Sequence, residues 1–289
     1  MAFQRRKAVW NLPAGPITLG VRTLLAARIN LVQANTPGRG AGNAAVDLAN
    51  EMEEVGADLV ELNPGPKTLT GALPSPTDEL PRLVPVLRKL GPQLSVPITV
   101  LTANTETAKE AIALGATVIH DPTGLAFDKD LAPAVNEAGA SMILGHMRGA
   151  PEQWRRLEPL PRLYDHVRTD FLASLLRAHK AGIERRKIVL DPGLEHGKRG
   201  HENFKLLRSV STLVPPGQGV QVTLAGKRFF LGSVRATAAQ REAALTVAAT
   251  LALESGAHML TVLRPDALRD AVAVIDRIYR ADEAGGGIG

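Results

Sequence analysis

The stretch ITVLTANTETAKEAIALGATVIHD, residues 98–121, contains one complete strand–helix–strand unit. Its apolar ends, Ile98–Thr102 and Thr117–Asp121, are rich in branched residues and are typical of short buried strands. Between them, Thr105–Leu114 carries apolar residues at helical spacing. This helix ends at Leu114-Gly115-Ala116, because glycine adopts the left-handed conformation that closes a helix at little cost, and the next strand begins at once.

The same alternation runs along the rest of the chain, with a strand candidate roughly every 30 to 35 residues. The other strand candidates are Ala27–Asn35, Asp58–Asn63, Ser141–Met147, Ile188–Asp191, Gln221–Leu224 and Met259–Leu263. The other helix candidates are Asn43–Val55, Thr77–Leu90, Asp130–Ala138, Leu163–Ala181, Asn203–Leu213, Ala238–Glu254 and Asp266–Tyr279.

Eight strand–helix units predict an α/β fold, a (β/α)8 TIM barrel, as a single domain over residues 1–289. The barrel itself is expected over about residues 18–280, with a short N-terminal extension and a flexible C-terminal tail. An open doubly wound sheet is the alternative. It has little support, because Gly38, Gly40 and Gly42 are too closely spaced for a GxGxxG turn.

The composition limits the classes of function. With 289 residues and 45% hydrophobic side chains, the chain has enough apolar material for a sizeable core. It has no cysteine, so disulfides and thiolate chemistry are excluded and a metal could use only oxygen or imidazole ligands. The net charge is +5, but the basic residues are spread out and only 3% of residues are aromatic, so no nucleic-acid partner is expected. No apolar run approaches the ~18 residues of a membrane span, and no secretory signal is visible, so a cytoplasmic protein is expected.

Polar side chains follow nearly every strand candidate, and a barrel of this type carries its chemistry at these strand ends. In the predicted barrel the following side chains converge on one mouth: His120, Asp121, His146, Arg148, Asp191, Lys198, Lys227 and Arg228. Asn35 and Asn63, which end the first two strand candidates, join them as candidate substrate-binding residues. Two acids with several cations suit an anionic or polar heterocyclic small molecule.

These residues also have structural interpretations. An aspartate before proline, such as Asp121 or Asp191, often bonds only the backbone amides of its own turn. His146 can be a buried strand-end residue, and the cations after the seventh strand candidate can be a solvated pair. Glu195 and His196 offer acid–base groups in a Gly-flanked loop. No HExxH, Walker A, GxSxG or metal-ligand pattern is present, so the sequence predicts no particular metal site.

Several segments resemble motifs of the dihydropteroate synthase family. The strongest matches are His146–Pro151 (HMRGAP), close to HMRGTP, and Val189–Gly193 with Gly197-Lys198, close to LDPGIGFGK. Shorter matches are His120–Leu125, Val96–Val100, Lys227–Gly232 and Gly56–Glu61. Their order and spacing agree with the family from about Thr18 to Ile278.

The resemblance implies a (β/α)8 barrel that condenses a pterin carrying a methylene diphosphate with 4-aminobenzoate and releases diphosphate, with Mg2+ assisting. Asp191 matches the pterin-binding aspartate of the family. Arg228 falls at the pterin-site lysine and Lys227 at the neighbouring arginine, so these three are the candidate catalytic residues. Asn30 matches the first-loop asparagine if no gap is allowed, whereas Thr36-Pro37 match that motif if one is.

The sequence departs from the family at other positions of the pterin site. The acid expected after the third strand candidate is Leu101, which cannot accept a hydrogen bond, and the asparagine of the fourth is His120. Gly145 replaces a methionine and is expected to widen the pocket floor. The last strand has Thr261 and Leu263 where the family has an arginine and a histidine that handle diphosphate. Because each lost partner in a buried polar set costs ~1–3 kcal/mol, little or no dihydropteroate synthesis is expected.

These observations leave several hypotheses. The first is a diverged transferase related to dihydropteroate synthase, acting on an altered substrate that need not be a pterin. Its pocket is expected to be more apolar than a pterin site, with a basic rim formed by Lys198, Lys227 and Arg228. The second is a non-catalytic paralogue that serves as a binding or interaction protein. The third is a dihydropteroate synthase with relocated contacts, for example through Asn104 and Arg264. Pterin-linked methyl transfer is the fourth.

A homodimer is also expected. The resemblance implies one, with the interface formed by the last helices of the barrel. The helix candidates Ala238–Glu254 and Asp266–Tyr279 are more apolar than one buried stripe requires.

Overall fold

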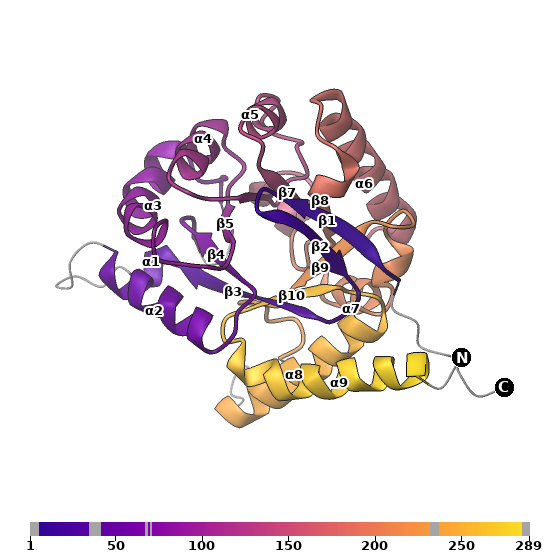
Figure 1. Ribbon diagram of the computed structural model, residues 1–289. Helices are drawn as coiled ribbons and strands as arrows, with labels where there is room; N and C mark the ends of the chain where they lie inside the picture. The colour runs from indigo at the N-terminus through magenta and orange to yellow at the C-terminus, as the bar shows by residue number, and fades with distance from the viewer. Residues whose placement is uncertain (1–5, 35–41, 67–68, 70, 232–236, 285–289) are drawn as a thin grey trace.

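Eight parallel strands close into a barrel in a computed structural model of the chain, and helices surround the barrel (Figure 1). The structure describes residues 6–34, 42–66, 69, 71–231 and 237–284. The strand order around the barrel is β10, β3, β4, β5, β6, β7, β8, β9, so the first and last barrel strands along the sequence pair with each other. The predicted (β/α)8 barrel is confirmed, and the open doubly wound sheet is wrong.

Most elements lie within a few residues of their predicted bounds. The barrel strands are β3 (Leu24–Asn30), β4 (Leu59–Asn63), β5 (Ile98–Leu101), β6 (Val118–Asp121), β7 (Ser141–Gly145), β8 (Ile188–Asp191), β9 (Gly219–Thr223) and β10 (Met259–Val262). The α-helices are α1 (Leu31–Ala34), α2 (Asn43–Glu54), α3 (Pro76–Leu90), α4 (Thr105–Ala113), α5 (Leu131–Glu137), α6 (Leu163–Lys180), α7 (Gly200–Leu207), α8 (Ala238–Glu254) and α9 (Asp266–Ala284). Three short 3-10 helices are η1 (Pro151–Arg156), η2 (Arg185–Lys187) and η3 (Val210–Thr212).

The first barrel strand differs from the prediction, which placed it at Ala27–Asn35. Strand β3 begins at Leu24 and ends at Asn30, and helix α1 follows directly. Apolar residues follow on both sides of Asn30, the last residue of the strand, so the apolar pattern alone does not mark the end of the strand.

A two-stranded antiparallel hairpin precedes the barrel, where the sequence indicated only an extension. Its strands are β1 (Ala8–Leu12) and β2 (Gly15–Leu19). Trp10 of β1 is fully buried. It belongs to an apolar cluster that includes Leu59, Ile143 and Met259 of the barrel strands. Because these partners lie near the N-terminal ends of their strands, the hairpin covers the end of the barrel opposite the mouth (Figure 1).

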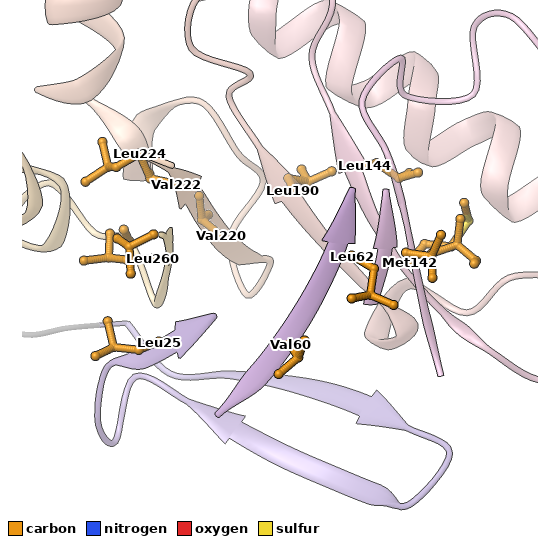
Figure 2. Close-up of a cluster of buried hydrophobic side chains, with 14 of the residues drawn as sticks. Leu25, Val60, Leu62, Met142, Leu144, Leu190, Val220, Val222, Leu224 and Leu260 are labelled. Carbon is orange, nitrogen blue, oxygen red and sulfur yellow. The ribbon is translucent and has the colours of Figure 1, made fainter. Parts of the chain in front are cut away.

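Side chains alternate between the inside of the barrel and the helix layer, as the period of a strand requires. In β4, Val60 and Leu62 belong to the large core between strands and helices, part of which is shown in Figure 2. Leu59 belongs instead to the cluster around Trp10 inside the barrel. The intervening positions Glu61 and Asn63 therefore face inward, toward the C-terminal mouth.

None of the helices in the described part of the chain is both long and apolar enough to cross a lipid bilayer.

Candidate functional site

The alternation of the barrel strands decides which side chains form the inner wall of the mouth. The inward positions nearest the C-terminal strand ends are Arg28, Asn30, Glu61, Asn63, Leu101, His120, Gly145, Asp191, Thr223 and Thr261. Three of these positions, Arg28, Glu61 and His120, carry ionisable groups linked directly to one another. Leu101 is on β5, between the strands that carry Glu61 and His120. The family resemblance predicts an acid at this position.

Arg28, Glu61 and His120 form a buried hydrogen-bonded chain. The Nε atom of Arg28 donates to one carboxylate oxygen of Glu61, and Nδ1 of His120 lies 2.6 Å from the other oxygen. The side chain of Glu61 is 1% exposed and that of Arg28 is 9% exposed. Burial alone would raise the pKa of Glu61, but Arg28 and His120 outweigh it and lower this pKa to about 2. Glu61 is therefore ionised at neutral pH and fixes the orientation of Arg28.

Asp191, at the end of β8, already has protein donors on both carboxylate oxygens. One oxygen accepts from the backbone N–H of Gly193 at 2.7 Å. The other accepts from the hydroxyl of Thr223 at 2.5 Å and from the amide of Gln221 at 3.1 Å. The side chain is only 1% exposed. A ligand that used this carboxylate would have to share it with these donors.

Asn30 and Asn63 form an amide pair at the ends of β3 and β4. The Nδ2 atom of Asn63 donates to Oδ1 of Asn30 at 2.8 Å, and its own Oδ1 accepts from the backbone of Gly65 at 3.1 Å. Asn30 at the strand end fits the alignment that needs no gap in the first loop. Asn35, the other amide predicted there, lies outside the described residues.

Lys227 and His196 face each other at the mouth. Nζ of Lys227 lies 3.2 Å from Nε2 of His196, whose ring stacks on Trp154 with a centroid distance of 5.7 Å. Burial, and then the positive charge of Arg28, lowers the pKa of Lys227 to about 8. Burial and the charge of Lys227 hold the pKa of His196 well below its usual range. At neutral pH Lys227 is thus mostly a cation that donates to a neutral imidazole.

A hollow at the mouth combines basic groups with an apolar wall. Arg28, Lys227 and His196 line it together with Asn63. Its apolar lining consists of Pro66, Leu69, Leu73, Pro74, Leu101, Ala103, Pro122, Trp154 and Ala225. This combination is typical of sites for small molecules with an apolar body and a few polar anchors.

Two carboxylates also line this hollow, and both are already hydrogen-bonded. Glu79 of α3 accepts from Thr102 at 2.7 Å and from Asn104 at 2.9 Å, and burial raises its pKa. Glu195 accepts from the backbone N–H groups of Arg228 and of the residue after it, at 2.7 Å each. These acids therefore organise the loops of the mouth.

Gly145 does not widen the pocket, so that expectation was wrong. A Cβ atom at this position would lie 2.8 Å from the Cα and from the carbonyl oxygen of Pro122. The backbone after β6 fills the space that the missing side chain leaves. Leu101 remains as the apolar change in the lining of the hollow.

Asp121, His146 and Arg148 contact loops and helices. Asp121 occupies a helix-facing position of β6, and its carboxylate accepts from the backbone and hydroxyl of Thr123. His146 lies 2.9 Å from Asp170 of α6 and packs edge-on against a phenylalanine of that helix. Arg148 donates to a backbone carbonyl in the loop after η1. Asp121 thus bonds its own turn and His146 is a buried residue at a strand end, which are the structural roles given as alternatives from the sequence.

Lys198 and Arg228 also lie apart from the hollow. Nζ of Lys198 donates to the carbonyls of His146 and Gly193 at 2.7 Å each, so it ties together the loops that follow β7 and β8. Arg228 is exposed, whereas the preceding Lys227 is buried in the mouth. Among the described residues, the basic lining therefore comes from Lys227 and from Arg28, and the sequence reasoning did not single out Arg28.

The residues present do not fit a metal held by protein side chains. In the part of the chain that the structure describes, no three carboxylate or imidazole groups are close enough together to hold an ion. Thr261, at the position of the family's diphosphate-site arginine, has a buried hydroxyl without a partner among these residues.

Sequence reasoning missed Arg28, Glu61 and Glu79. A signal was present for the first two, because each is a lone charged residue within an apolar strand of a barrel whose strands are buried on both faces. An ionisable residue in such a strand must face a partner inside the protein. Glu79 had no comparable signal, since an acid in the first turn of a helix is common at the surface.

The chain is similar to known proteins over most of its length. Residues 39–263 match the family described as "Pterin binding enzyme". The dihydropteroate synthase of Mycobacterium leprae is 33% identical over 242 residues, which cover 80% of this chain and 84% of that protein. The dihydropteroate synthase of Synechocystis sp. is 28% identical and covers 82% of each chain.

Solved structures show the same relationship. The dihydropteroate synthase of Burkholderia cenocepacia complexed with 7,8-dihydropteroate superposes with a TM-score of 0.82 at 27% identity, covering 96% of this chain and 98% of that one. The enzyme of Xanthomonas albilineans with 4-aminobenzoic acid also gives a TM-score of 0.82 at 27% identity, covering 98% of this chain and all of that one.

Proposed function

The chain belongs to the pterin-binding enzyme family, within its dihydropteroate synthase branch, and from this premise we propose that it is a transferase of that type acting on a substrate other than a pterin. Such a reaction breaks a bond from carbon to an anionic leaving group and forms a bond to an incoming nucleophile. The protein must bind both reactants, neutralise the charge that develops on the leaving group and exclude water.

The observation that carries this proposal is Leu101, an apolar side chain at the inner-wall position where the family resemblance predicts an acid. A pterin presents amino and ring N–H donors, which need acceptors that are free. Leu101 offers no acceptor, and Asp191 already accepts from Gly193, Thr223 and Gln221. Because an unpaired polar group in a buried site is penalised, these features disfavour a pterin ring.

Several side chains of the hollow support a group-transfer reaction, whichever substrate it uses. Lys227 is a buried cation at the mouth, and its N–H groups can stabilise an anion as it leaves. His196, held neutral beside it, accepts a hydrogen bond from Lys227 and so orients this cation at the hollow. The apolar wall around Leu101 limits the access of water. These groups line one hollow, as group transfer requires.

Dihydropteroate synthesis itself is the second candidate. It is favoured by the relatives named above and by Glu61, a buried carboxylate one strand away from Leu101. Glu61 could take part in binding a pterin only if the Arg28 head group made room for the ring. The two candidates therefore differ in one measurable property, the affinity of the resting protein for pterins.

The decisive experiment combines an activity assay with calorimetry. Purified protein is given pterin diphosphate and 4-aminobenzoate, and we expect turnover far below about one per second, a rate in the normal range for enzymes. Pterin analogues should bind weakly to the wild type and more tightly to Leu101→Asp, with Leu101→Asn as the uncharged control. Rapid turnover, or tight pterin binding that Leu101→Asp leaves unchanged or weakens, would establish the second candidate instead.

We also propose a cytoplasmic homodimer that binds a small-molecule substrate. The absence of cysteine and the apolar last two helices support these assignments.

A further inference from the structure

Glu195 joins two loops of the mouth. It lies in the loop after β8, and one of its carboxylate oxygens accepts hydrogen bonds from the backbone N–H groups of Arg228 and Phe229, at 2.7 Å each. These two residues follow Lys227 directly in the loop after β9. In this arrangement Lys227 is buried and Arg228 is exposed. The contact therefore fixes the backbone at the point that decides which of the two cations faces the hollow.

The backbone conformation of Glu195 is unfavourable for its residue type. Its φ of +66° lies in the left-handed region, which residues other than glycine adopt only rarely. The motif LDPGIGFGK has glycine at the corresponding place. The turn does not need this side chain, because the backbone N–H of Glu195 donates to the buried side chain of Asn203 at 2.7 Å. A strained residue that its own turn does not require indicates a role for its carboxylate, here in the contact with the neighbouring loop.

The next residue, His196, holds the other end of Lys227. Its Nε2 atom lies 3.2 Å from Nζ of the lysine, and its ring stacks on Trp154. The motif LDPGIGFGK has phenylalanine here, which offers no nitrogen or oxygen acceptor for an ammonium N–H. Two consecutive residues thus hold Lys227, one at the backbone that follows it and the other at its ammonium group.

We propose that Glu195 is a positioning residue, which determines that Lys227 rather than Arg228 is the loop cation that lines the hollow. With its acceptor in place, the loop after β9 keeps the arrangement in which Lys227 is buried in the mouth. Without it, the loop opens locally and the lysine leaves the hollow for part of the time. The family resemblance placed Arg228 at the pterin-site lysine, and this contact gives a physical reason for the difference. The catalytic role of Lys227 rests on the proposed function, whereas its position does not.

Glu195 also acts on Lys227 through its charge, so the two effects must be separated. Burial and the charge of Arg28 lower the pKa of Lys227, and Glu195, Asp191 and Glu61 oppose this lowering. Glu195→Gln removes the charge but keeps an oxygen that can accept both N–H groups. Glu195→Ala removes the charge and the acceptor. Glu195→Gly also removes both, but glycine suits the left-handed backbone.

Chemical labelling of lysines measures the position of Lys227 without a substrate. The proteins are methylated with formaldehyde and a borane reductant at about pH 9, above the Lys227 pKa of about 8, so that this lysine is mainly uncharged and its rate reports its accessibility. Peptide mass spectrometry gives the rate at each lysine. We expect Lys227 to react at least about tenfold faster in Glu195→Ala and Glu195→Gly than in the wild type, because two charge-assisted hydrogen bonds are lost. In Glu195→Gln its rate should stay within about threefold of the wild-type rate.

Two controls separate this effect from a general loss of stability. Lys187, at the opposite end of the barrel, is half-buried and donates to the carbonyl of Gly139 at 3.1 Å, so its rate should be the same in every variant. Glu137→Ala, at an exposed position of α5, should not alter the rate at Lys227. Thermal melts should show that Glu195→Gly is more stable than Glu195→Ala, yet both should expose Lys227. A merely structural role of Glu195 would instead make the labelling rate follow the melting temperature.

The proposal is overturned if Lys227 keeps its wild-type rate in Glu195→Ala and Glu195→Gly, or if its protection follows the melting temperature. It is also overturned if Lys227 reacts as fast in Glu195→Gln as in Glu195→Ala, since the charge and not the hydrogen bonds would then place the lysine. A parallel rise at Lys187 would overturn it as well. These outcomes can be separated from failure of the proposed function. Rapid turnover of pterin diphosphate would refute the proposed function and leave the labelling result intact, whereas unchanged labelling without such turnover refutes this inference alone.

Discussion

The carboxylate of Glu61 is almost completely removed from water, and two neighbours compensate for that burial. An isolated buried carboxylate would take up a proton, but Arg28 and His120 each bond one of its oxygens. Arg28, held by this contact, also lines the hollow. Glu61, inside the barrel, thereby fixes the position of a cation that lines the hollow at the mouth.

Replacing Glu61 should therefore destabilise the whole fold. Glu61→Gln removes the negative partner and leaves Arg28 buried without a counter-charge, which costs about 3–5 kcal/mol for buried pairs. Urea unfolding followed by circular dichroism measures this loss. Glu137→Gln, at an exposed position of α5, serves as the control and should change the free energy of unfolding by less than about 0.5 kcal/mol. Equal effects of the two substitutions would contradict this account of Glu61.

The contribution of Glu61 should also depend on pH. Its pKa in the folded protein, about 2, is lower than its ordinary value of 4.5, so folding favours the ionised form. The resulting stability is fully present above pH 4.5 and is lost as the pH falls from there toward 2. The difference in unfolding free energy between wild type and Glu61→Gln should shrink over this range. A difference that stays constant between about pH 6 and about pH 3 would show that the carboxylate is not stabilised in this way.

The candidate residues show what the sequence could and could not reveal. Leu101 was expected in the pocket, and it lines the hollow. Asp121 and His146 were expected at the mouth because they end strands, yet alternation along β6 and β7 turns them toward the helices. Counting positions along each strand from one known inward residue would have separated these two from His120. Which loop cation enters the mouth, Lys227 or its neighbour, depends on backbone geometry that no strand pattern encodes.

Among the secondary-structure elements, the helix ends were the most predictable. Gly115 has a φ of +104°, the left-handed conformation expected after α4, and the strand follows directly. The hairpin of β1 and β2 was missed, because its side chains alternate only over short runs and it belongs to no repeat. Its stability comes from contacts with residues far away in the sequence, which local patterns do not report.

The hairpin should contribute to stability without affecting the mouth. Trp10→Ala removes a fully buried ring from the N-terminal end of the barrel and should cost about 3–5 kcal/mol. Ile17→Ala, a half-buried position on β2, should cost less. Calorimetry with pterin analogues, at a temperature where both variants are folded, should give the same affinity as for the wild type. A loss below about 1 kcal/mol for Trp10→Ala would mean that the hairpin does not close the barrel as described.

At the scale of the whole molecule, the two ends of the barrel have different roles. The N-terminal end is filled by an apolar cluster around Trp10, which favours stability. The C-terminal end holds the buried ionised groups and the hollow of the candidate site. This division follows from the barrel topology, since all eight strands point their C-terminal ends to the same side. It also leaves the outer helix layer free to form contacts with another subunit.

The last two helices are expected to form a homodimer interface. Val247 and Leu251 of α8 are 60% and 43% exposed, and Val274 and Ile278 of α9 are 55% and 56% exposed. Each pair is spaced by four residues, so it lies on one face of its helix, and the two helices pack against each other. Leu172 and Leu176 of α6 are 58% and 52% exposed and form a similar pair, but on a single helix.

Light scattering at micromolar concentration should therefore give the mass of a dimer. Introducing Glu at both Val247 and Ile278 should convert it to a monomer, because burying two unpaired carboxylates costs more than a typical interface tolerates. The matched control is Leu172→Glu, at a side chain 58% exposed on α6, which should remain dimeric. A wild type that is monomeric, or a dimer broken by Leu172→Glu and not by the double variant, would place the interface elsewhere or exclude it.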